Sequence, residues 1–223
     1  MHSFSGTILF VDISGFTPLS ARLTAEGSAG VETLSTTLND YFDKQIQIIL
    51  HFGGDITKFA GDAVIAVWRE EKKTSIEEIG PRTPHLALQA GVLLRDELHD
   101  YETDVGVRLS IKSGIGFGDI TEYFVGGVNG RWEYLCSGDP LYQVGRCEHQ
   151  CNKGDIVVSE EIWPHLDDMC EGQVFDDTGD VRVFEITKVS KDVPDVHMTL
   201  RNTMRAALAS YVPGVVHEHL VRH

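Results

Sequence analysis

The sequence has few basic residues and no long apolar run. It carries 19 lysines and arginines against 34 aspartates and glutamates, which gives a formal net charge of −15. Non-specific nucleic-acid binding depends on basic side chains that neutralise phosphates, so this balance argues against it. No apolar run approaches the roughly 18 residues that a bilayer-spanning helix needs, and the N-terminus lacks a signal-peptide pattern. We therefore expect a soluble, cytoplasmic protein with no membrane span.

Cysteine is also scarce. The four cysteines show no spacing typical of a disulfide framework, which favours a reducing compartment. Cys147 and Cys151 would share one face of a helix while His149 points elsewhere, so a zinc site is the weaker interpretation. The simpler one is a pair of half-buried thiols.

The composition is that of an ordinary globular protein. Hydrophobic residues make up 42% of the 223 residues and charged residues 24%, enough for a sizeable core. We expect one domain over residues 1–188. Residues 189–223 would then form a C-terminal extension or a connector to a second domain.

Apolar periodicity and turn residues predict a mixed α/β (α+β) fold. Residues 4–12 contain an unbroken apolar run, and the turn after them leads into a helix that Thr17 would cap and Pro18 would begin. The elements expected next are a helix that ends near 51, strands 55–59 and 63–68, a surface loop 69–82, a helix 84–101, strands near 107–111, 120–126 and 131–136, a helix 138–151, a strand 156–158, a short helix 159–166 and a hairpin within 172–188. This order indicates a ferredoxin-like sandwich, a mainly antiparallel sheet with helices on one face.

Two aspartates fifty positions apart lie inside short motifs that contain glycine. Asp12 belongs to the motif of residues 9–17 (LFVDISGFT), and Asp62 to the motif of residues 53–63 (GGDITKFAGDA). Each acidic residue sits where an apolar strand meets a turn, so the two carboxylates can meet at one edge of a sheet. Paired carboxylates on strand ends, beside glycines that let a phosphate approach the backbone, suit a magnesium–nucleotide site.

These motifs resemble those of the class III nucleotidyl cyclases, most of all the first catalytic domain of soluble, bicarbonate-responsive adenylyl cyclases. The resemblance runs from about residue 6 to 188 and weakens after residue 138. It implies conversion of ATP to cyclic AMP and pyrophosphate. It also implies an active site at the interface of two such domains, in a homodimer or a tandem pair.

The resemblance also implies roles for individual residues. Asp12 and Asp62, with the carbonyl of Ile13, would bind two Mg²⁺ or Mn²⁺ ions. One ion would activate the ribose 3′-hydroxyl for attack on the α-phosphate, and the other would neutralise the departing pyrophosphate. The triphosphate would be held at the start of the first helix and near the second aspartate, by Ser14, Gly15, Phe16, Thr17 and Gly61.

A later family motif, Gly-Asp-x-Val-Asn-x-x-x-Arg, is only partly matched by residues 138–146. Arg146 matches the arginine that steadies the transition-state phosphate, but Tyr142 replaces the ribose-orienting asparagine and Leu135 replaces the base-selecting aspartate. By resemblance, Lys58 and Arg146 would instead form a small anion site for bicarbonate. The chain therefore keeps the metal half of a site, and we expect a partner domain to supply the rest, which leaves GTP open as a substrate.

Two other functions compete with this one. The first is a regulatory pseudo-cyclase domain that binds bicarbonate or nucleotide without turnover, favoured by Tyr142 and Leu135 but not by the intact aspartates. The second is another phosphoryl-transfer enzyme, such as a diguanylate cyclase or a polymerase-like palm, which the run Gly53-Gly54-Asp55 superficially suggests. No acidic residue follows at position 56, so this second alternative ranks last.

Overall fold

In the computed structural model of the chain, residues 2–70 and 81–188 are described. The expected connector, residues 189–223, and most of the expected surface loop lie outside these ranges. Within them, none of the helices combines the length and the apolar character that crossing a membrane requires.

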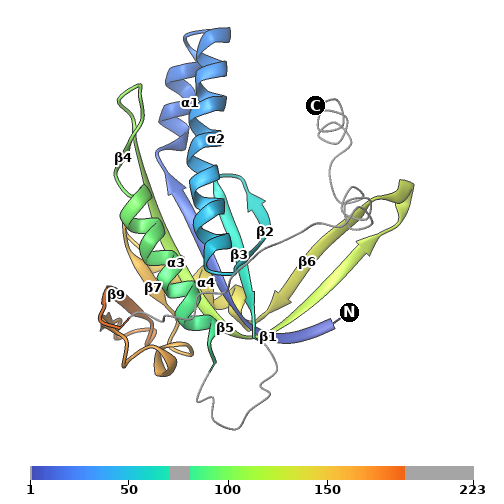
Figure 1. Cartoon of the computed structure of the whole chain (residues 1–223), viewed down its shortest axis with the longest axis vertical. Coiled ribbons are helices and arrows are strands. Elements are labelled where there is room, and N and C mark those ends of the chain that lie inside the picture. Colours follow the sequence, from blue (N-terminus) through green and yellow to red (C-terminus); the bar gives the residue numbers. More distant parts are fainter. Residues whose placement is uncertain (1, 71–80, 189–223) are drawn as a thin grey trace.

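The strands form one large, mainly antiparallel sheet (Figure 1). Its main path runs β2-β3-β1-β5-β7-β9-β8, while β4 and β6 pair with β5 beside that path. Only β5 and β7 are parallel neighbours among the described strands. The strands are β1 (His2–Ser14), β2 (Asp55–Ala60), β3 (Ala63–Arg69), β4 (Tyr101–Glu102), β5 (Arg108–Gly126), β6 (Trp132–Gly138), β7 (Ile156–Val158), β8 (Cys170–Val174) and β9 (Val181–Ile186). The predicted mixed fold with a mainly antiparallel sheet is confirmed.

Four α-helices accompany the sheet in the described residues. They are α1 (Phe16–Thr24), α2 (Ser28–His51), α3 (Thr83–Leu98) and α4 (Asp139–Gln150). The short helix expected over 159–166 is only a 3-10 turn at Trp163–His165. Backbone bonds of 3-10 spacing, such as Leu166 N–H to the Trp163 carbonyl at 2.8 Å, alternate here with isolated bonds of α-helical spacing, so no regular α-helix forms.

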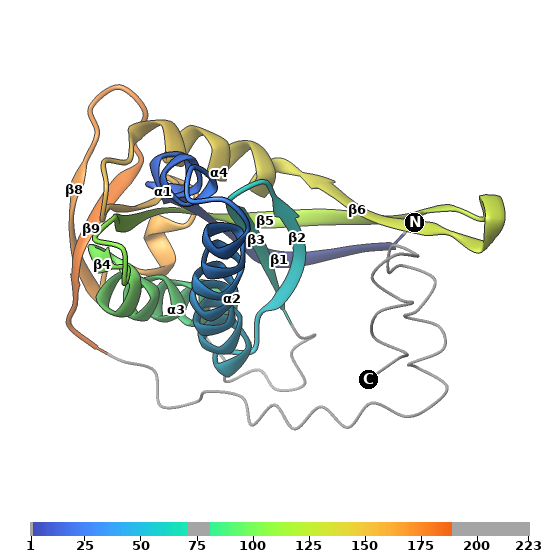
Figure 2. The same cartoon turned by 90° about the horizontal axis from the view of Figure 1, so that it is seen from above.

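The helices do not all cover one face, so that expectation is wrong for α4. In Figure 2, α2 and α3 lie on one side of the sheet and α4 on the other. Successive residues of β5 point to opposite faces of the sheet, and their neighbours show the same division of the helices. A Cβ on Gly114 or Gly116 would meet Val144 or Gln143 of α4, whereas Ile115 lies near Gly91 of α3.

Two strands predicted from the sequence form the single strand β5, which runs through these glycines. The sequence predicted one strand near 107–111 and another near 120–126, with Gly114, Gly116 and Gly118 between them. In the structure the strand continues through them. A Cβ on Gly114 would lie 2.7 Å from the carbonyl oxygen of Val144, so glycine lets α4 pack close to the sheet.

Strand β1 divides its side chains between the two faces. Leu9, Val11 and Ile13 belong to the main core that α2 and α3 cover, while Ile8 packs in a smaller cluster with Val144 of α4. Because successive side chains of a strand alternate, Asp12 shares the α4 face with Ile8. The first aspartate motif therefore presents its carboxylate on the face opposite the main core.

Candidate active site

Asp12 and Asp62 lie at adjoining ends of neighbouring strands. The antiparallel register of β1 and β3 runs from Gly6 opposite Arg69 to Val11 opposite Val64. One further step sets Asp12 opposite Ala63, the chain neighbour of Asp62. The two carboxylates, fifty residues apart in sequence, are thus carried to one place by strand pairing.

The turn that holds Asp62 is a two-residue hairpin. Ala60 pairs with Ala63 across it, which leaves Gly61 and Asp62 as the turn residues. Gly61 has φ +69°, a conformation that residues with a Cβ rarely adopt and that glycine allows at little cost. The glycine thereby allows the tight turn that carries Asp62 at the end of the hairpin.

The Asp12 side chain is partly buried and lies among charged groups. Burial raises the pKa of the Asp12 carboxyl above its usual range, and the charges of Asp62 and Glu148 raise it further, while Lys112 lowers it. The effect of Asp62 means that the two aspartates interact electrostatically. Lys112 lies directly opposite Asp12 in the register of β1 and β5, and its Nζ is 3.5 Å from Oδ2 of Asp12. It also forms an ion pair with Glu148 of α4.

The first turn of α1 begins immediately after β1, beside these carboxylates. Gly15 is the N-cap, with φ +103°, and the helix starts at Phe16 with no side-chain cap. The expectation that Thr17 caps the helix and Pro18 begins it is therefore wrong, since both already lie within the first turn. Backbone N–H groups in the first turn of a helix lack partners within the helix, so those of Phe16 and Thr17 are available to an anion.

A bulge in β2 brings Lys58 to the α4 face. The pairing of β2 with β3 shifts between Ile56 and Lys58, so that Lys58 lies opposite Ile65. Without this shift Lys58 would oppose Val64 and point into the main core.

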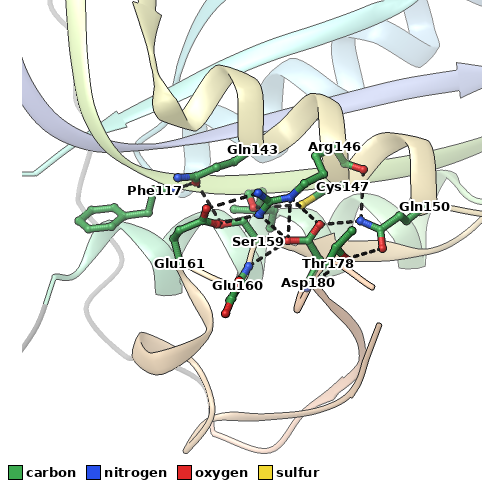
Figure 3. Close-up of polar contacts among 11 residues, drawn as sticks. Phe117, Gln143, Arg146, Cys147, Gln150, Ser159, Glu160, Glu161, Thr178 and Asp180 are labelled. Atoms are coloured by element: carbon green, nitrogen blue, oxygen red, sulfur yellow. Dashed lines mark hydrogen bonds and ion pairs between the residues drawn. The ribbon is translucent and has the colours of Figure 1, made fainter. Parts of the chain in front are cut away.

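Arg146 is held by carboxylates of its own chain (Figure 3). Its Nε donates to both oxygens of Asp180, at 2.9 and 3.1 Å, and its Nη2 donates to Asp180 and Glu161 at 2.6 and 2.8 Å. The hydrogen bond with Asp180 raises the pKa of Arg146 above its usual range. Lys58 is on β2, at one edge of the sheet. Asp180, the partner of Arg146, directly precedes β9, which lies near the opposite edge. Arg146 is therefore engaged by Asp180 and Glu161, and its combined anion site with Lys58 stays a prediction.

The two residues that depart from the family motif are exposed. Tyr142 on α4 is 73% exposed and Leu135 on β6 is 42% exposed.

The whole chain is similar to known cyclases. A family model described as the adenylate and guanylate cyclase catalytic domain matches residues 4–193. The chain belongs to this family. The human protein "Adenylate cyclase type 10" is 28% identical over 225 residues, covering 100% of this chain but only 13% of the human protein. This cyclase domain thus spans a small part of that relative.

Solved structures of other cyclases share the fold of this chain. The adenylyl cyclase CyaB from P. aeruginosa superposes with a TM-score of 0.63 and 25% identity, covering 86% of this chain and 98% of CyaB. A guanylyl cyclase domain of the RhoGC fusion protein from the aquatic fungus Blastocladiella emersonii, described as a non-canonical dimer, gives a TM-score of 0.64 and 22% identity, covering 82% of this chain and 96% of the fungal domain. The chain is therefore a cyclase catalytic domain by family and by fold.

The residues at the carboxylate pair fit a divalent metal. Asp12 and Asp62 offer oxygen ligands of the kind that Mg²⁺ and Mn²⁺ prefer, and a cation would relieve the repulsion between them. Within residues 2–70 and 81–188, no group of three or more His, Cys, Asp or Glu side chains could hold an ion without help. A bound ion would take its remaining ligands from backbone oxygens, water and the phosphates of a nucleotide, as Mg²⁺ usually does at phosphate-transfer sites.

Sequence reasoning missed three charged residues of this cyclase domain: Lys112, Glu148 and Asp180. Strand alternation in β1 and β5 was visible in the sequence, but the register that pairs Lys112 with Asp12 was not. Asp180 lies 34 residues from Arg146, with no local pattern that links them. All three roles depend on contacts between distant segments.

Proposed function

We propose that this cyclase domain converts ATP to cyclic AMP and pyrophosphate, together with a second cyclase domain. The ribose 3′-hydroxyl would attack the α-phosphorus and lose its proton. The new bond joins O3′ to phosphorus, and the bond to the oxygen that bridges to the β-phosphate breaks. The observation that carries this proposal is the juxtaposition of Asp12 and Asp62 in a chain of the cyclase family.

In this proposal, Asp12 and Asp62 bind two divalent cations, Mg²⁺ or Mn²⁺, with help from the carbonyl of Ile13. Such cations supply positive charge to the phosphates and acidify a bound hydroxyl. The carboxylates belong to the end of β1 and to a tight hairpin turn, so their positions are set by strand pairing rather than by loose loops. Rigid placement matters because small displacements of the reacting atoms cost large factors in rate.

The triphosphate would be held next to the carboxylates. The backbone from Ser14 through Gly15 to Phe16 and Thr17 passes directly from β1 into α1, and the helix start favours negative charge. Gly61 leaves open space at the hairpin, since a Cβ there would meet nothing within 4 Å. A phosphate can therefore approach this turn closely.

A second cyclase domain would complete the site, as a tandem neighbour or as another copy of the chain. Arg146 is engaged by Asp180 and Glu161, and Tyr142 and Leu135 stand exposed where the family motif has polar residues. A tandem neighbour of different sequence would supply the ribose and purine contacts that this chain lacks, whereas a second copy of the chain would hold ribose and purine poorly.

ATP is the proposed substrate because the human relative and CyaB are both adenylyl cyclases by name. The fungal structure is a guanylyl cyclase, so the experiment compares both nucleotides. The purified chain is incubated with ATP or GTP and Mn²⁺, and the products are separated by chromatography and mass spectrometry. Cyclic AMP in at least tenfold excess over cyclic GMP supports the assignment. Cyclic GMP as the main product overturns it.

A regulatory domain without turnover is the second candidate, favoured by the capture of Arg146 in ion pairs. Such a domain would bind nucleotide or bicarbonate and act on an active partner. Metal-dependent ATP binding with no cyclic product, even at high protein concentration and with an active cyclase domain added, would favour this candidate.

A further inference from the structure

Strand β5 changes its pairing partner partway along its length. Residues 113–115 pair with the parallel strand β7, and residues 120–126 pair with β6. Between them, at residues 116–119, the sheet forks into its body and a long hairpin that we call the arm, made of residues 120–126 and 132–138 (Figure 2). Helix α4 begins at this fork, because β6 ends at Gly138 and α4 starts at Asp139.

One side chain of α4 fills the gap in pairing at the fork (Figure 3). The backbone N–H of Phe117 donates to Oε1 of Gln143, at 2.8 Å. In the ladder of β5 and β7, the N–H of Ser159 donates to the carbonyl oxygen of Ile115. The next bond of this parallel pattern would run from Phe117 N–H to the carbonyl of Ser159. The Gln143 amide oxygen thus takes the place of a strand carbonyl.

The carbonyl of Ser159 is engaged elsewhere. It accepts hydrogen bonds from the backbone N–H groups of Ile162 and Trp163, at 3.1 and 3.2 Å, where the chain leaves the sheet. The Ser159 hydroxyl donates to the same Oε1 of Gln143, at 3.0 Å. Ser159 is completely buried and Gln143 is 4% exposed, so water does not compete for these bonds. Gln143 therefore ties α4 both to β5 and to the end of β7.

Glycines let the first turn of α4 lie directly on the fork. A Cβ at Gly116 would lie 2.7 Å from Oε1 of Gln143 and 2.8 Å from the carbonyl oxygen of Pro140. A Cβ at Gly138 would lie 2.2 Å from the carbonyl oxygen of Asp119. The first turn is thus held at two points, by the chain connection at Gly138 and by the hydrogen bonds of Gln143.

We propose that Gln143 is a positioning residue that fixes the first turn of α4 to β5 and so sets where α4 stands relative to the arm. This inference rests on the proposed function. The exposed side chains of Tyr142 on α4 and Leu135 on the arm belong to the two elements that a second cyclase domain has to meet at once. Because Asp180 holds Arg146 one turn further along, loss of Gln143 frees the beginning of α4 and not its end.

The first test is amide hydrogen exchange at Phe117, followed by NMR. Gln143→Met removes the acceptor, so exchange at Phe117 should become at least about tenfold faster, while the amides of β7 change by less than about threefold. Gln143→Glu keeps an oxygen acceptor at the same reach and should restore slow exchange. Gln89→Met is the matched control, because Gln89 is 5% exposed and donates within its own helix, α3. Unchanged exchange at Phe117 in Gln143→Met overturns the proposal.

Residual dipolar couplings of backbone amides measure how α4 is oriented relative to the sheet. In wild type, the couplings of residues 139–150 should fit the same alignment as those of β1 and β3. In Gln143→Met, the couplings of residues 139–143 should depart from this alignment, while those of residues 146–150 still fit it. Couplings that fit equally well in both proteins contradict the positioning role. If Gln143→Met does not fold, Gln143→Asn, whose amide is one methylene too short to reach Phe117, takes its place.

Turnover gives the functional readout, with Mn²⁺–ATP and a second cyclase domain present. Gln143→Met should lower the rate of cyclic AMP formation by about tenfold and leave Mn²⁺–ATP binding within about twofold, because Asp12 and Asp62 are carried by a strand end and a hairpin turn. Gln143→Glu should recover the rate. An equal fall in rate in Gln89→Met, or a wild-type rate in Gln143→Met, overturns the functional role.

Failure of this inference is distinguishable from failure of the proposed function. If wild type forms cyclic GMP, or binds ATP without forming a cyclic product, the proposed function fails. The exchange rate of Phe117 and the couplings of α4 do not depend on turnover, so they still decide whether Gln143 positions the helix.

Discussion

The guanidinium of Arg146 is bound to the carboxylate of Asp180, which is completely buried. Asp180 also accepts hydrogen bonds from the side chain of Gln150, at 2.6 Å, and from the backbone N–H of Glu160, at 3.0 Å. The carboxylate thus joins helix α4 to the segments that lead into the β8–β9 hairpin. A buried charge with this many donors is a fixed point of the structure rather than a mobile surface pair.

Asp180→Asn should therefore strongly lower the free energy of unfolding. It leaves the Arg146 charge without its main partner, and breaking such a pair typically costs about 3 kcal/mol. Urea unfolding followed by circular dichroism measures the loss. Glu161→Gln is the matched control, because Glu161 is 45% exposed and its contact with Arg146 should be worth less than about 1 kcal/mol. Equal losses in the two variants would contradict the role given to Asp180.

The pair formed by Glu122 and Arg69 predicts a pH dependence of stability. The hydrogen bond from Arg69 lowers the pKa of the Glu122 carboxyl below its usual range. A lowered folded-state pKa stabilises the fold above the unfolded-state pKa, about 4.3, and this contribution is lost as pH falls through the folded-state value.

Glu122→Gln should consequently destabilise the chain at pH 7, by about 1 kcal/mol, since Arg69 is 39% exposed and the pair is partly screened. The difference from wild type should shrink as the pH falls below about 4, where the wild-type carboxyl also becomes neutral. Urea titrations at several pH values measure it. A difference that stays constant from pH 7 to pH 3 would show that the charge of Glu122 does not contribute.

Gly54 is predicted to tolerate no side chain. A Cβ there would lie 2.5 Å from Cζ2 of Trp68, whose buried ring is fixed by a 2.8 Å hydrogen bond from Nε1 to the carbonyl oxygen of Phe52. Gly54→Ala should destabilise the fold by about 2 kcal/mol through overpacking. In Gly145→Ala, the added Cβ meets nothing within 4 Å on α4, so helix propensity should stabilise the chain by up to about 1 kcal/mol. Thermal unfolding of both variants tests the contrast, and a harmless Gly54→Ala would contradict it.

The sequence allowed the positions of most strands and of the two aspartates to be predicted, because these depend on local signals. The apolar run before Asp12 and the glycine before Asp62 specify a strand end and a hairpin turn without reference to the rest of the chain. Antiparallel pairing of β1 with β3 then brings the carboxylates together. The family resemblance pointed to the same fold.

The contacts around the basic residues could not be predicted in this way. Lys58 changes face because of one bulge, which alters the pairing by a single residue and has no clear sequence signal. Arg146 fits a family motif, yet its partners Asp180 and Glu161 come from later segments that only the folded chain brings near. Long-range ion pairs depend on register and packing, which motifs do not encode.

The most direct test of the account is the rate of cyclic AMP formation from Mn²⁺–ATP, measured over a wide range of protein concentration. Wild type, Asp12→Asn, Asp62→Asn and Asp55→Asn are compared, the last because Asp55 is an exposed aspartate of the same motif. We predict that the wild-type rate rises faster than linearly with protein concentration. Asp12→Asn and Asp62→Asn should each lose at least about a hundredfold, equivalent to about 2.7 kcal/mol of transition-state stabilisation, while Asp55→Asn stays within about twofold. Wild-type rates in Asp12→Asn or Asp62→Asn would contradict the account.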